Sequence, residues 1–300
     1  MRILLVGQSG QVAHELERSL ACLGEVITRS RNSQPSLDLL NPDSIGTRVR
    51  DAQPDLIVNA AAYTQVDRAE SEIDAAFTIN ARAVEALAFA CRDHKIPLIH
   101  FSTDYVFDGT SQTPYRETDP TGPDGVYATS KWQGEEAIRQ AGIPHLILRT
   151  AWVYGLHGQN FLKTMLRLMA ERESLGIVND QFGAPTWSRM IAEATALMIA
   201  KSLHAGRMDL GERAGTYHLT AQGTTTWFGF AEKIRALAIQ KGHLAPTAAS
   251  LRAITTEEYP TPARRPAYSV LDNRRLRDAY GLSLPFWDRS LDLCLETHPS

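Results

Sequence analysis

The sequence has few cysteines and no long apolar segment. Cys22, Cys91 and Cys294 are its only cysteines, and they form no C-x-x-C motif. We therefore expect no disulfide framework and a cytoplasmic location. The apolar run after Met1 covers only Ile3–Val6, which is too short for a signal peptide. No other run approaches the length of a membrane span, so we expect no membrane association.

Net charge and histidine spacing exclude further classes. The 31 basic and 34 acidic residues give a formal net charge of −3 at pH 7, which does not favour non-specific binding to nucleic acid or to membranes. The nine histidines show no H-E-x-x-H or similar spacing, so the residues alone indicate no metal site. What remains is a soluble globular protein, and 300 residues fit one large domain or two unequal lobes.

Short apolar strands alternate with helical patterns through the first half of the chain. The strands expected are Arg2–Val6, Glu25–Arg31, Asp55–Ala62, Leu98–Phe101 and Pro144–Arg149. Helices are expected up to about Leu23, over Ala75–Asp93 and from Tyr127 to about Ala141. This alternation predicts an α/β protein with a Rossmann-type, doubly wound parallel sheet over residues 1–155.

From Gly158 onward the pattern changes. A strand-like segment covers Thr216–Thr220, a helix is expected over Trp227–Lys241, and the rest is irregular. We interpret residues 156–300 mainly as a smaller C-terminal α/β lobe that binds the substrate. A helix near residues 186–203 is expected to complete the first domain.

The first strand ends in a glycine turn. Gly7 and Gly10 are followed by Gln11, Val12 and Ala13, in the spacing G-x-x-G-x-x-A. Glycines let backbone N–H groups approach a pyrophosphate, and the following helix N-terminus stabilises its charge. The turn therefore favours dinucleotide binding, although the spacing differs from G-x-G-x-x-G.

The end of the second strand bears on the choice of cofactor. Arg29, Ser30 and Arg31 stand there, and the nearest acid is Asp38. An acid would bind the ribose 2′-hydroxyl of NAD, whereas basic residues accommodate the 2′-phosphate of NADP. This favours NADPH. A solvated loop with two arginines explains the same residues.

Polar and small residues follow the next two strands. Ala60–Ala62 end the third strand, and Thr103 and Asp104 follow the fourth. Because ligands of such sheets bind at the carboxyl ends of the strands, we expect these residues to lie beside the glycine turn. Arg264 and Arg265, in the C-terminal lobe, are available to bind phosphates.

Tyr127 and Lys131 are four residues apart and therefore share one face of the expected helix. We expect the ammonium to lower the pKa of the phenol, so that Tyr127 acts as an acid or base, with Thr103 bonded to the reacting oxygen. Taken alone, the pair reads equally as a surface tyrosine and a solvated lysine. Trp152 either stacks on a sugar or packs in the core.

Taken together, these motifs resemble the extended short-chain dehydrogenases/reductases. The runs Ser102–Phe107, Arg149–Tyr154, Asn179–Thr186 and Tyr259–Pro262 are similar to the dTDP-4-dehydrorhamnose reductase family, in order along almost the whole chain. The resemblance implies that NADPH reduces C4 of dTDP-4-dehydro-L-rhamnose to give dTDP-L-rhamnose, an activated sugar for cell-surface polysaccharides.

The resemblance also implies roles for single residues. Tyr127 would donate the proton, Lys131 would lower its pKa and hold the nicotinamide ribose, and Thr103 would position the substrate. The implied cofactor contacts, with those from the turns, are Gly7, Gly10, Gln11, Val12, Arg29, Ser30, Asp38, Leu39, Ala62, Tyr63, Thr64, Tyr127 and Lys131. The implied substrate contacts are Thr103, Asp104, Tyr127 and Trp152.

The sequence departs from the family at two places. Ser30 stands where relatives often carry an acid, which shifts the expectation towards NADPH and leaves NADH open. Some relatives bind Mg²⁺ between subunits of a homodimer, and Glu15 and Glu296 match two of the positions involved. Arg189 stands at the third, where its charge would repel a metal ion. We therefore expect no metal-bridged dimer.

Two alternatives stay open. A related sugar-nucleotide epimerase or dehydratase would share most of these motifs, but such dehydratases usually carry an acid where this chain has Tyr105. A non-catalytic protein resembling the regulatory subunit of methionine adenosyltransferase would bind cofactor without turnover. The presence of Thr103, Tyr127 and Lys131 argues against it.

Overall fold

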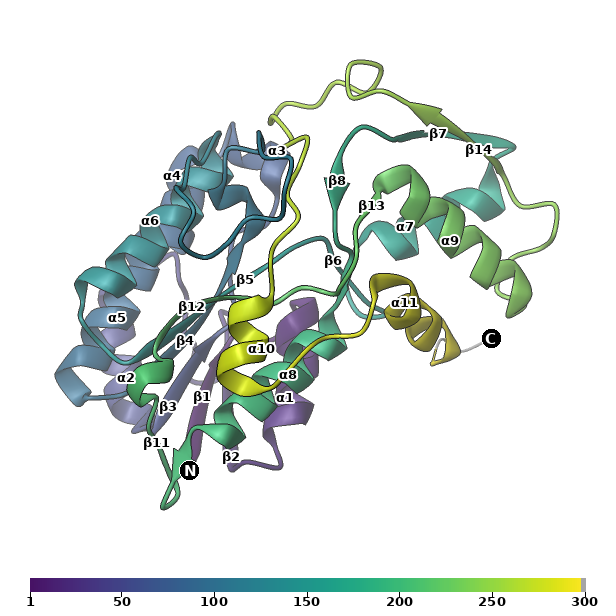
Figure 1. Cartoon of the computed structure of the whole chain (residues 1–300). Helices are drawn as coiled ribbons and strands as arrows, with labels where there is room; N and C mark the ends of the chain where they lie inside the picture. Colours follow the sequence, from purple (N-terminus) through teal and green to yellow (C-terminus); the bar gives the residue numbers. More distant parts are fainter. Residues whose placement is uncertain (298–300) are drawn as a thin grey trace.

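The computed structural model describes residues 1–297, and its centre is a six-stranded parallel sheet (Figure 1). Neighbouring strands pair in parallel throughout. In spatial order the strands are β12 (Gly215–His218), β5 (His145–Thr150), β4 (Leu98–Thr103), β3 (Leu56–Asn59), β1 (Arg2–Val6) and β2 (Glu25–Arg29). The predicted Rossmann-type sheet is confirmed.

Both faces of the sheet are buried, which explains why its strands are almost continuously apolar. Alternate residues of β1 enter different cores: Ile3 and Leu5 enter one, and Leu4 and Val6 the other. The first core lies under α1 (Gln11–Leu20), α8 (Ser188–Lys201) and α10 (Arg274–Tyr280). The second lies under α2 (Ile45–Ala52), α5 (Ala83–His94) and α6 (Val126–Gln140).

The order of the strands creates the place where a ligand can bind. The chain leaves β1 to form β2 on one side, and it later returns to form β3 on the other side of β1. The turns after β1 and β3 therefore diverge at a topological switch point. A crevice at the carboxyl ends of the strands is expected at such a point.

The helix expected over Ala75–Asp93 is present but not regular. It begins as α4 (Ile73–Phe77), continues as a π-helical segment over Thr78–Arg82, and ends as α5. A π-helical turn inside a longer helix frequently marks a functional site. A four-residue helix, α3 (Val66–Ala69), precedes α4.

Two elements from the second half of the chain belong to the sheet. Strand β12 pairs with β5 at the edge, although it falls within the range that the sequence assigned mainly to the C-terminal lobe. Helix α8 packs against α1 in the first core. The boundary at residue 155 remains a prediction.

The second lobe lies beside the sheet (Figure 1). A separate core that includes Leu162, Trp187, Phe230 and Leu291 holds it together. Its elements are α7 (Phe161–Glu171), β7 (Ser174–Val178), β8 (Phe182–Gly183), β13 (Thr225–Thr226), α9 (Trp227–Gln240), β14 (Ser250–Ile254) and α11 (Trp287–Glu296). Here β7 pairs with β14, and β8 with β13.

Shorter elements complete the architecture. Strand β6 (Val153–Tyr154) pairs with β9 (Thr186–Trp187), and β10 (Leu203–His204) pairs with β11 (Arg207–Met208). Short 3-10 turns cover Pro42–Ser44, Asp104–Val106 and Gly211–Arg213. Among the described residues, no helix is both long and apolar enough to span a membrane.

Candidate active site

The turn after β1 is shaped for close approach of a ligand. Gly7 has φ +113°, which disfavours any side chain, and a Cβ atom on it would lie 3.2 Å from the backbone nitrogen of Ala61. Gly10 differs, because it has φ −75° and a Cβ atom there would meet nothing within 4 Å. The fold therefore does not require a glycine at position 10, and the space beside it is open.

Helix α1 begins at this open space. Gly10 is its N-cap and supplies no side-chain hydrogen bond, and the first turn of the helix contains no acidic residue. The first backbone N–H groups of a helix lack partners inside the helix. They are therefore available to an anion such as a pyrophosphate.

The turns after β2 and β3 lie next to this helix end. Ser30 donates a hydrogen bond from its hydroxyl to Gln8, 3.0 Å away. Arg29 is half-buried and bonds to the carbonyl oxygen of Thr28. The predicted strand Asp55–Ala62 ends at Asn59, so Ala60–Ala62 are already part of a turn.

The π-helical segment orients the turn after β3. Asn80 is buried; its Oδ1 accepts from the backbone N–H of Tyr63 at 2.9 Å, and its Nδ2 donates to the Tyr63 carbonyl oxygen at 3.0 Å. The same Nδ2 donates to the hydroxyl of Ser130 in α6. One side chain thus links the turn to the helix that carries Tyr127 and Lys131.

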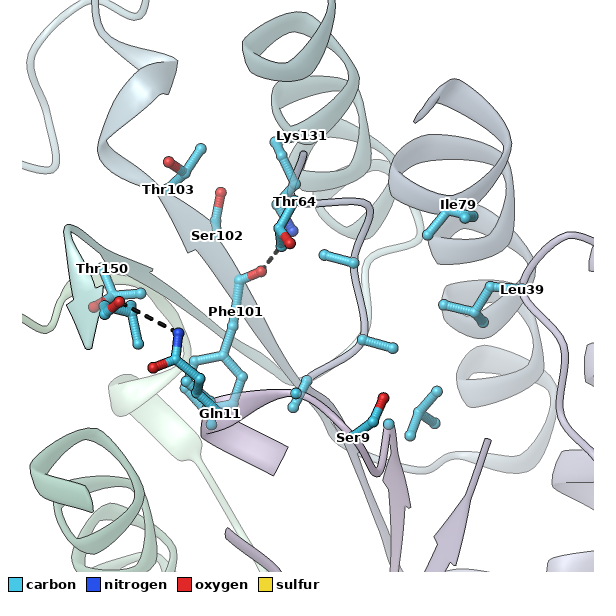
Figure 2. A pocket seen from close by; sticks show the side chains of 18 of the residues that line it. Ser9, Gln11, Leu39, Thr64, Ile79, Phe101, Ser102, Thr103, Lys131 and Thr150 are labelled. Atoms are coloured by element: carbon cyan, nitrogen blue, oxygen red, sulfur yellow. Dashed lines mark hydrogen bonds between the residues drawn. The ribbon is translucent and has the colours of Figure 1, made fainter. Parts of the chain in front are cut away.

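These turns and the ends of β4 and β5 enclose a cavity of about 700 Å³. Figure 2 shows Ser9 and Leu39 on one side of it and Thr103, Lys131 and Thr150 on the other. The predicted site residues that line it are Gly7, Gly10, Gln11, Val12, Arg29, Ser30, Asp38, Leu39, Ala62, Thr64, Thr103, Asp104, Tyr127, Lys131 and Trp152.

Tyr63 is the predicted site residue that does not line the cavity. Its hydroxyl donates to the Glu72 carboxylate at 2.6 Å, and its backbone is bonded to Asn80. Arg264 and Arg265 are also absent from the lining. Each is paired with a carboxylate, Asp124 for Arg264 and Asp67 for Arg265.

Thr103, Asp104 and Tyr127 form a polar cluster at the end of β4. The hydroxyl of Thr103 donates to Asp104 Oδ1 at 3.0 Å and accepts from the backbone N–H of Tyr105 at 3.2 Å. Burial raises the pKa of the Asp104 carboxyl to about 6, against the effect of its hydrogen bonds. Tyr105 packs edge-on against the ring of Tyr127, with 5.7 Å between centroids.

The expected lowering of the Tyr127 pKa is wrong for this structure. Desolvation by the surrounding protein raises the pKa of the phenol to about 12, although a hydrogen bond with Thr103 opposes the shift. Desolvation dominates because the charged phenolate would lose its hydration, and the nearby Asp104 carboxylate raises the pKa of the phenol further. The phenol is therefore protonated at neutral pH, which is the state that a proton donor needs.

The contacts of Lys131 explain why its charge is not directed at the phenol. Its Nζ donates to the carbonyl oxygen of Phe101 at 2.7 Å (Figure 2). It also lies 3.3 Å from Nε2 of His100. Burial lowers the pKa of Lys131 to about 8, while the nearby Glu135 carboxylate opposes that change.

His100 was not anticipated as part of the site. It is fully buried, its Nδ1 lies 3.0 Å from Asn59 Nδ2, and burial keeps its pKa well below the ordinary range. Asn59 Oδ1 accepts from the Ala61 N–H, so Asn59 Nδ2 is left to donate to His100. The available signal was one polar ring inside the apolar run Leu98–Phe101.

A buried ion pair underlies the helix that carries Tyr127 and Lys131. Glu135 accepts from Arg149 Nε at 2.9 Å and Nη2 at 2.7 Å, and both residues are at most 1% exposed. Arg139 Nη2 donates to the same carboxylate at 2.6 Å. This two-point contact ties α6 to β5 beneath the cavity.

Two tryptophans form the wall of the cavity beyond β5. Trp152 and Trp227 both line it, and their rings are stacked. Sequence reasoning identified Trp152 and missed Trp227, which begins α9 in the second lobe. Nothing local to Trp227 distinguishes it from a core residue, so only the folded chain reveals the pair.

The three positions considered for a metal ion are not arranged as ligands. Arg189 contacts Glu15 at 3.2 Å, and Glu296 lies 3.5 Å from Lys241. Residues 1–297 contain no group of three His, Cys, Asp or Glu side chains able to hold a metal ion. Both glutamates therefore have a cationic partner within the chain.

Comparison with known proteins shows the family of the chain. The family described as the RmlD substrate binding domain matches residues 1–299. The chain is 48% identical, over 98% of both chains, to a dTDP-4-dehydrorhamnose reductase of Burkholderia thailandensis. Two solved structures of dTDP-4-dehydrorhamnose reductases cover 99% of both chains. One, from Clostridium acetobutylicum, has a TM-score of 0.88 at 34% identity. The other, from Bacillus anthracis in complex with NADP, has a TM-score of 0.87 at 32% sequence identity.

Proposed function

The chain belongs to the family of the RmlD substrate binding domain, and from this premise we propose how its residues reduce a dTDP-linked 4-keto sugar. The chain is an NADPH-dependent reductase that converts dTDP-4-dehydro-β-L-rhamnose to dTDP-L-rhamnose, the last step of dTDP-rhamnose biosynthesis. The observation that carries the assignment of residues is that Thr103, Tyr127 and Lys131 share one cavity with the open turn at Gly10.

The cofactor fits the half of the cavity formed by the turns after β1, β2 and β3. The α1 N-terminus and the space beside Gly10 suit its pyrophosphate, and Arg29, Ser30 and Arg31 suit a 2′-phosphate. When bound there, NADPH supplies the hydride that reduces C4. We assign Asp38, Leu39, Ala62 and Thr64 to the remaining contacts on this side.

Tyr127 donates the proton to the C4 oxygen. Its phenol is protonated at neutral pH because desolvation raises its pKa to about 12. Thr103 holds the same oxygen by hydrogen bond when its single hydroxyl proton turns from Asp104 to the substrate, while the Tyr105 N–H keeps the Thr103 oxygen in place. General acid catalysis of this kind typically contributes a factor of roughly 10²–10⁴.

We assign Lys131, which lines the cavity, to the nicotinamide ribose of the cofactor. It lies one helical turn from Tyr127 on the same face of α6. The carbonyl oxygen of Phe101 accepts a hydrogen bond from its amine, and Glu135 favours its charged form.

Two further proposals concern where the protein acts and how its subunits assemble. We propose that the protein acts in the cytoplasm, which its three free cysteines support. A homodimer remains a prediction from the resemblance. We further propose that no Mg²⁺ bridges subunits, because Arg189 pairs with Glu15.

The test is to incubate the purified protein with dTDP-4-dehydrorhamnose and either NADPH or NADH, with deuterium at the transferable position. We expect faster oxidation of NADPH and deuterium at C4 of dTDP-rhamnose. Loss of water from a dTDP-hexose offered in place of dTDP-4-dehydrorhamnose, without net NADPH oxidation, would indicate the dehydratase alternative. Binding of NADPH without turnover would indicate the regulatory alternative.

A further inference from the structure

Trp152 and Trp227 come from different regions of the chain but form one wall of the cavity. Trp152 follows β5, and Trp227 begins α9 in the second lobe. Their ring centroids are 3.6 Å apart and the ring planes differ by 5°. The stacked rings thus join the end of the sheet to the second lobe at the cavity.

This wall lies on the substrate side of the reacting groups. The turns after β2, β1 and β3 form the cofactor half, and β4 carries Thr103. Strand β5, which leads to Trp152, lies beyond β4 in the sheet. A flat aromatic face there suits a sugar ring, which is largely apolar on one face and polar at its edge.

Trp152 is held in a strained conformation. Its φ is +47°, a left-handed value that is unfavourable for a bulky residue. Gly183 makes room for the ring, since a Cβ atom at that position would lie 2.4 Å from Cε2 of Trp152. Such backbone strain persists only where the surroundings over-determine the conformation.

Trp227 is held by the run Asn179-Asp180-Gln181. The indole Nε1–H of Trp227 donates to Gln181 Oε1 at 3.2 Å. Gln181 is buried, and its Nε2 donates to the hydroxyl of Thr256 at 3.0 Å. That hydroxyl donates in turn to Asp180 at 2.6 Å.

Asn179 fixes the start of the helix that carries Trp227. Thr226, the N-cap of α9, accepts from the Gly229 N–H at 3.0 Å. Its hydroxyl donates to Asn179 Oδ1 at 2.7 Å. Neither Asn179 nor Gln181 lines the cavity, so this run acts through the tryptophan that follows Thr226.

We propose that Gln181, Gly183 and Trp227 are positioning residues that set the orientation of Trp152 and thereby the affinity for the sugar-nucleotide substrate. This inference rests on the proposed reductase function. It assigns a role to the Asn179–Thr186 run, none of whose members carries out the chemistry. A purely structural role would change the stability of the protein without a selective effect on the substrate KM.

The test compares Gln181→Met, Trp227→Phe and Gly183→Ala with Trp287→Phe, a tryptophan of the second lobe that does not line the cavity. Losing the Trp227–Gln181 hydrogen bond should raise the KM for dTDP-4-dehydrorhamnose about threefold to tenfold. Gly183→Ala should have the larger effect because it displaces the Trp152 ring. The Kd for NADPH and the kcat should stay within about twofold, and Trp287→Phe should leave all three constants unchanged.

Near-ultraviolet circular dichroism gives a second readout that needs no activity. The signal of the stacked indoles should weaken in Gln181→Met and be retained in Trp287→Phe. An altered signal with an unchanged KM in Gln181→Met and Trp227→Phe would overturn the proposal. An inactive wild-type protein with the same spectral changes would instead refute the reductase function. If Gly183→Ala does not fold, the substrate KM of Gln181→Met and of Trp227→Phe still tests the proposal.

Discussion

The cofactor half of the cavity takes its residues from the loops that follow β1, β2 and β3, whereas the substrate half depends on contacts between distant segments. Gly7 and Gly10 lie in the turn that directly precedes α1. Trp152, by contrast, is supported by Gly183 and Trp227, which belong to the second lobe. Local sequence therefore specifies the first half, while long-range packing specifies the second.

The two regions also differ in where they place charge. The sheet region buries the pair Glu135–Arg149 beneath the catalytic helix. In the second lobe, Arg167 and Glu171 form an exposed pair on α7. A charge that loses its partner in the interior cannot be rescued by water, so equivalent substitutions should have very different effects in the two regions.

The largest expected effect is on stability. Glu135→Gln should lower the free energy of unfolding by about 3–5 kcal/mol, because Arg149 would keep a buried charge without a full counter-charge. Glu171→Gln, the matched change on α7, should cost at most about 1 kcal/mol. Urea unfolding of the two variants measures both values. Equal losses would show that the interior pair has no special role.

The next effect concerns the choice of cofactor. Replacing Arg29 and Arg31 together by alanine should weaken NADPH binding roughly tenfold or more while changing NADH binding little, since a charged hydrogen bond contributes about 1.5–3 kcal/mol. Cofactor fluorescence titration measures both Kd values. Arg274→Ala is the control, because Arg274 pairs with Asp272 away from the cavity. Similar losses for both cofactors would mean that these arginines do not bind the 2′-phosphate.

The smallest effect is that of pH on the kinetic constants. It should change the constant for NADPH, which reports the cofactor half, and leave unchanged a ratio of KM values that reports the substrate half. Lys131, with a pKa near 8, loses its positive charge as the pH rises through that value. The kcat/KM for NADPH, which reports the free enzyme, should therefore be level near pH 7 and fall above about pH 8, while the titration of Asp104 near pH 6 limits the level range on the acid side. Gln181, Trp152 and Trp227 do not titrate, so the ratio of substrate KM between Gln181→Met and the wild type should not change with pH. A ratio that varies across pH 6–9 would contradict this division.

Much of the sheet region was predictable from sequence, and the reason is local. The period of the apolar residues predicts its strands and helices, and the i,i+4 spacing places Tyr127 beside Lys131. Two features there were not predictable. The π-helical segment around Asn80 depends on bonds to Tyr63 and Ser130, and His100 gains its role only by contact with Lys131.

The Tyr127 pKa shows a second limit of sequence reasoning. Spacing indicates that a cation is close, but it does not give the desolvation of the phenol or the direction of the ammonium. In the structure, Lys131 points to the Phe101 carbonyl and desolvation dominates. In the second lobe, the Asn179–Gln181 run resembled the family, yet its contacts with Thr226, Trp227 and Thr256 join segments far apart in the sequence.

The most direct test of this account is the single-turnover rate of reduction by Tyr127→Phe, with the protein saturated by both NADPH and dTDP-4-dehydrorhamnose. Phenylalanine keeps the ring that packs against Tyr105 and removes only the hydroxyl that donates the proton. The rate should fall by a factor of roughly 10²–10⁴ while the Kd for NADPH is unchanged. A rate equal to that of the wild type would contradict the assignment of Tyr127 as the proton donor.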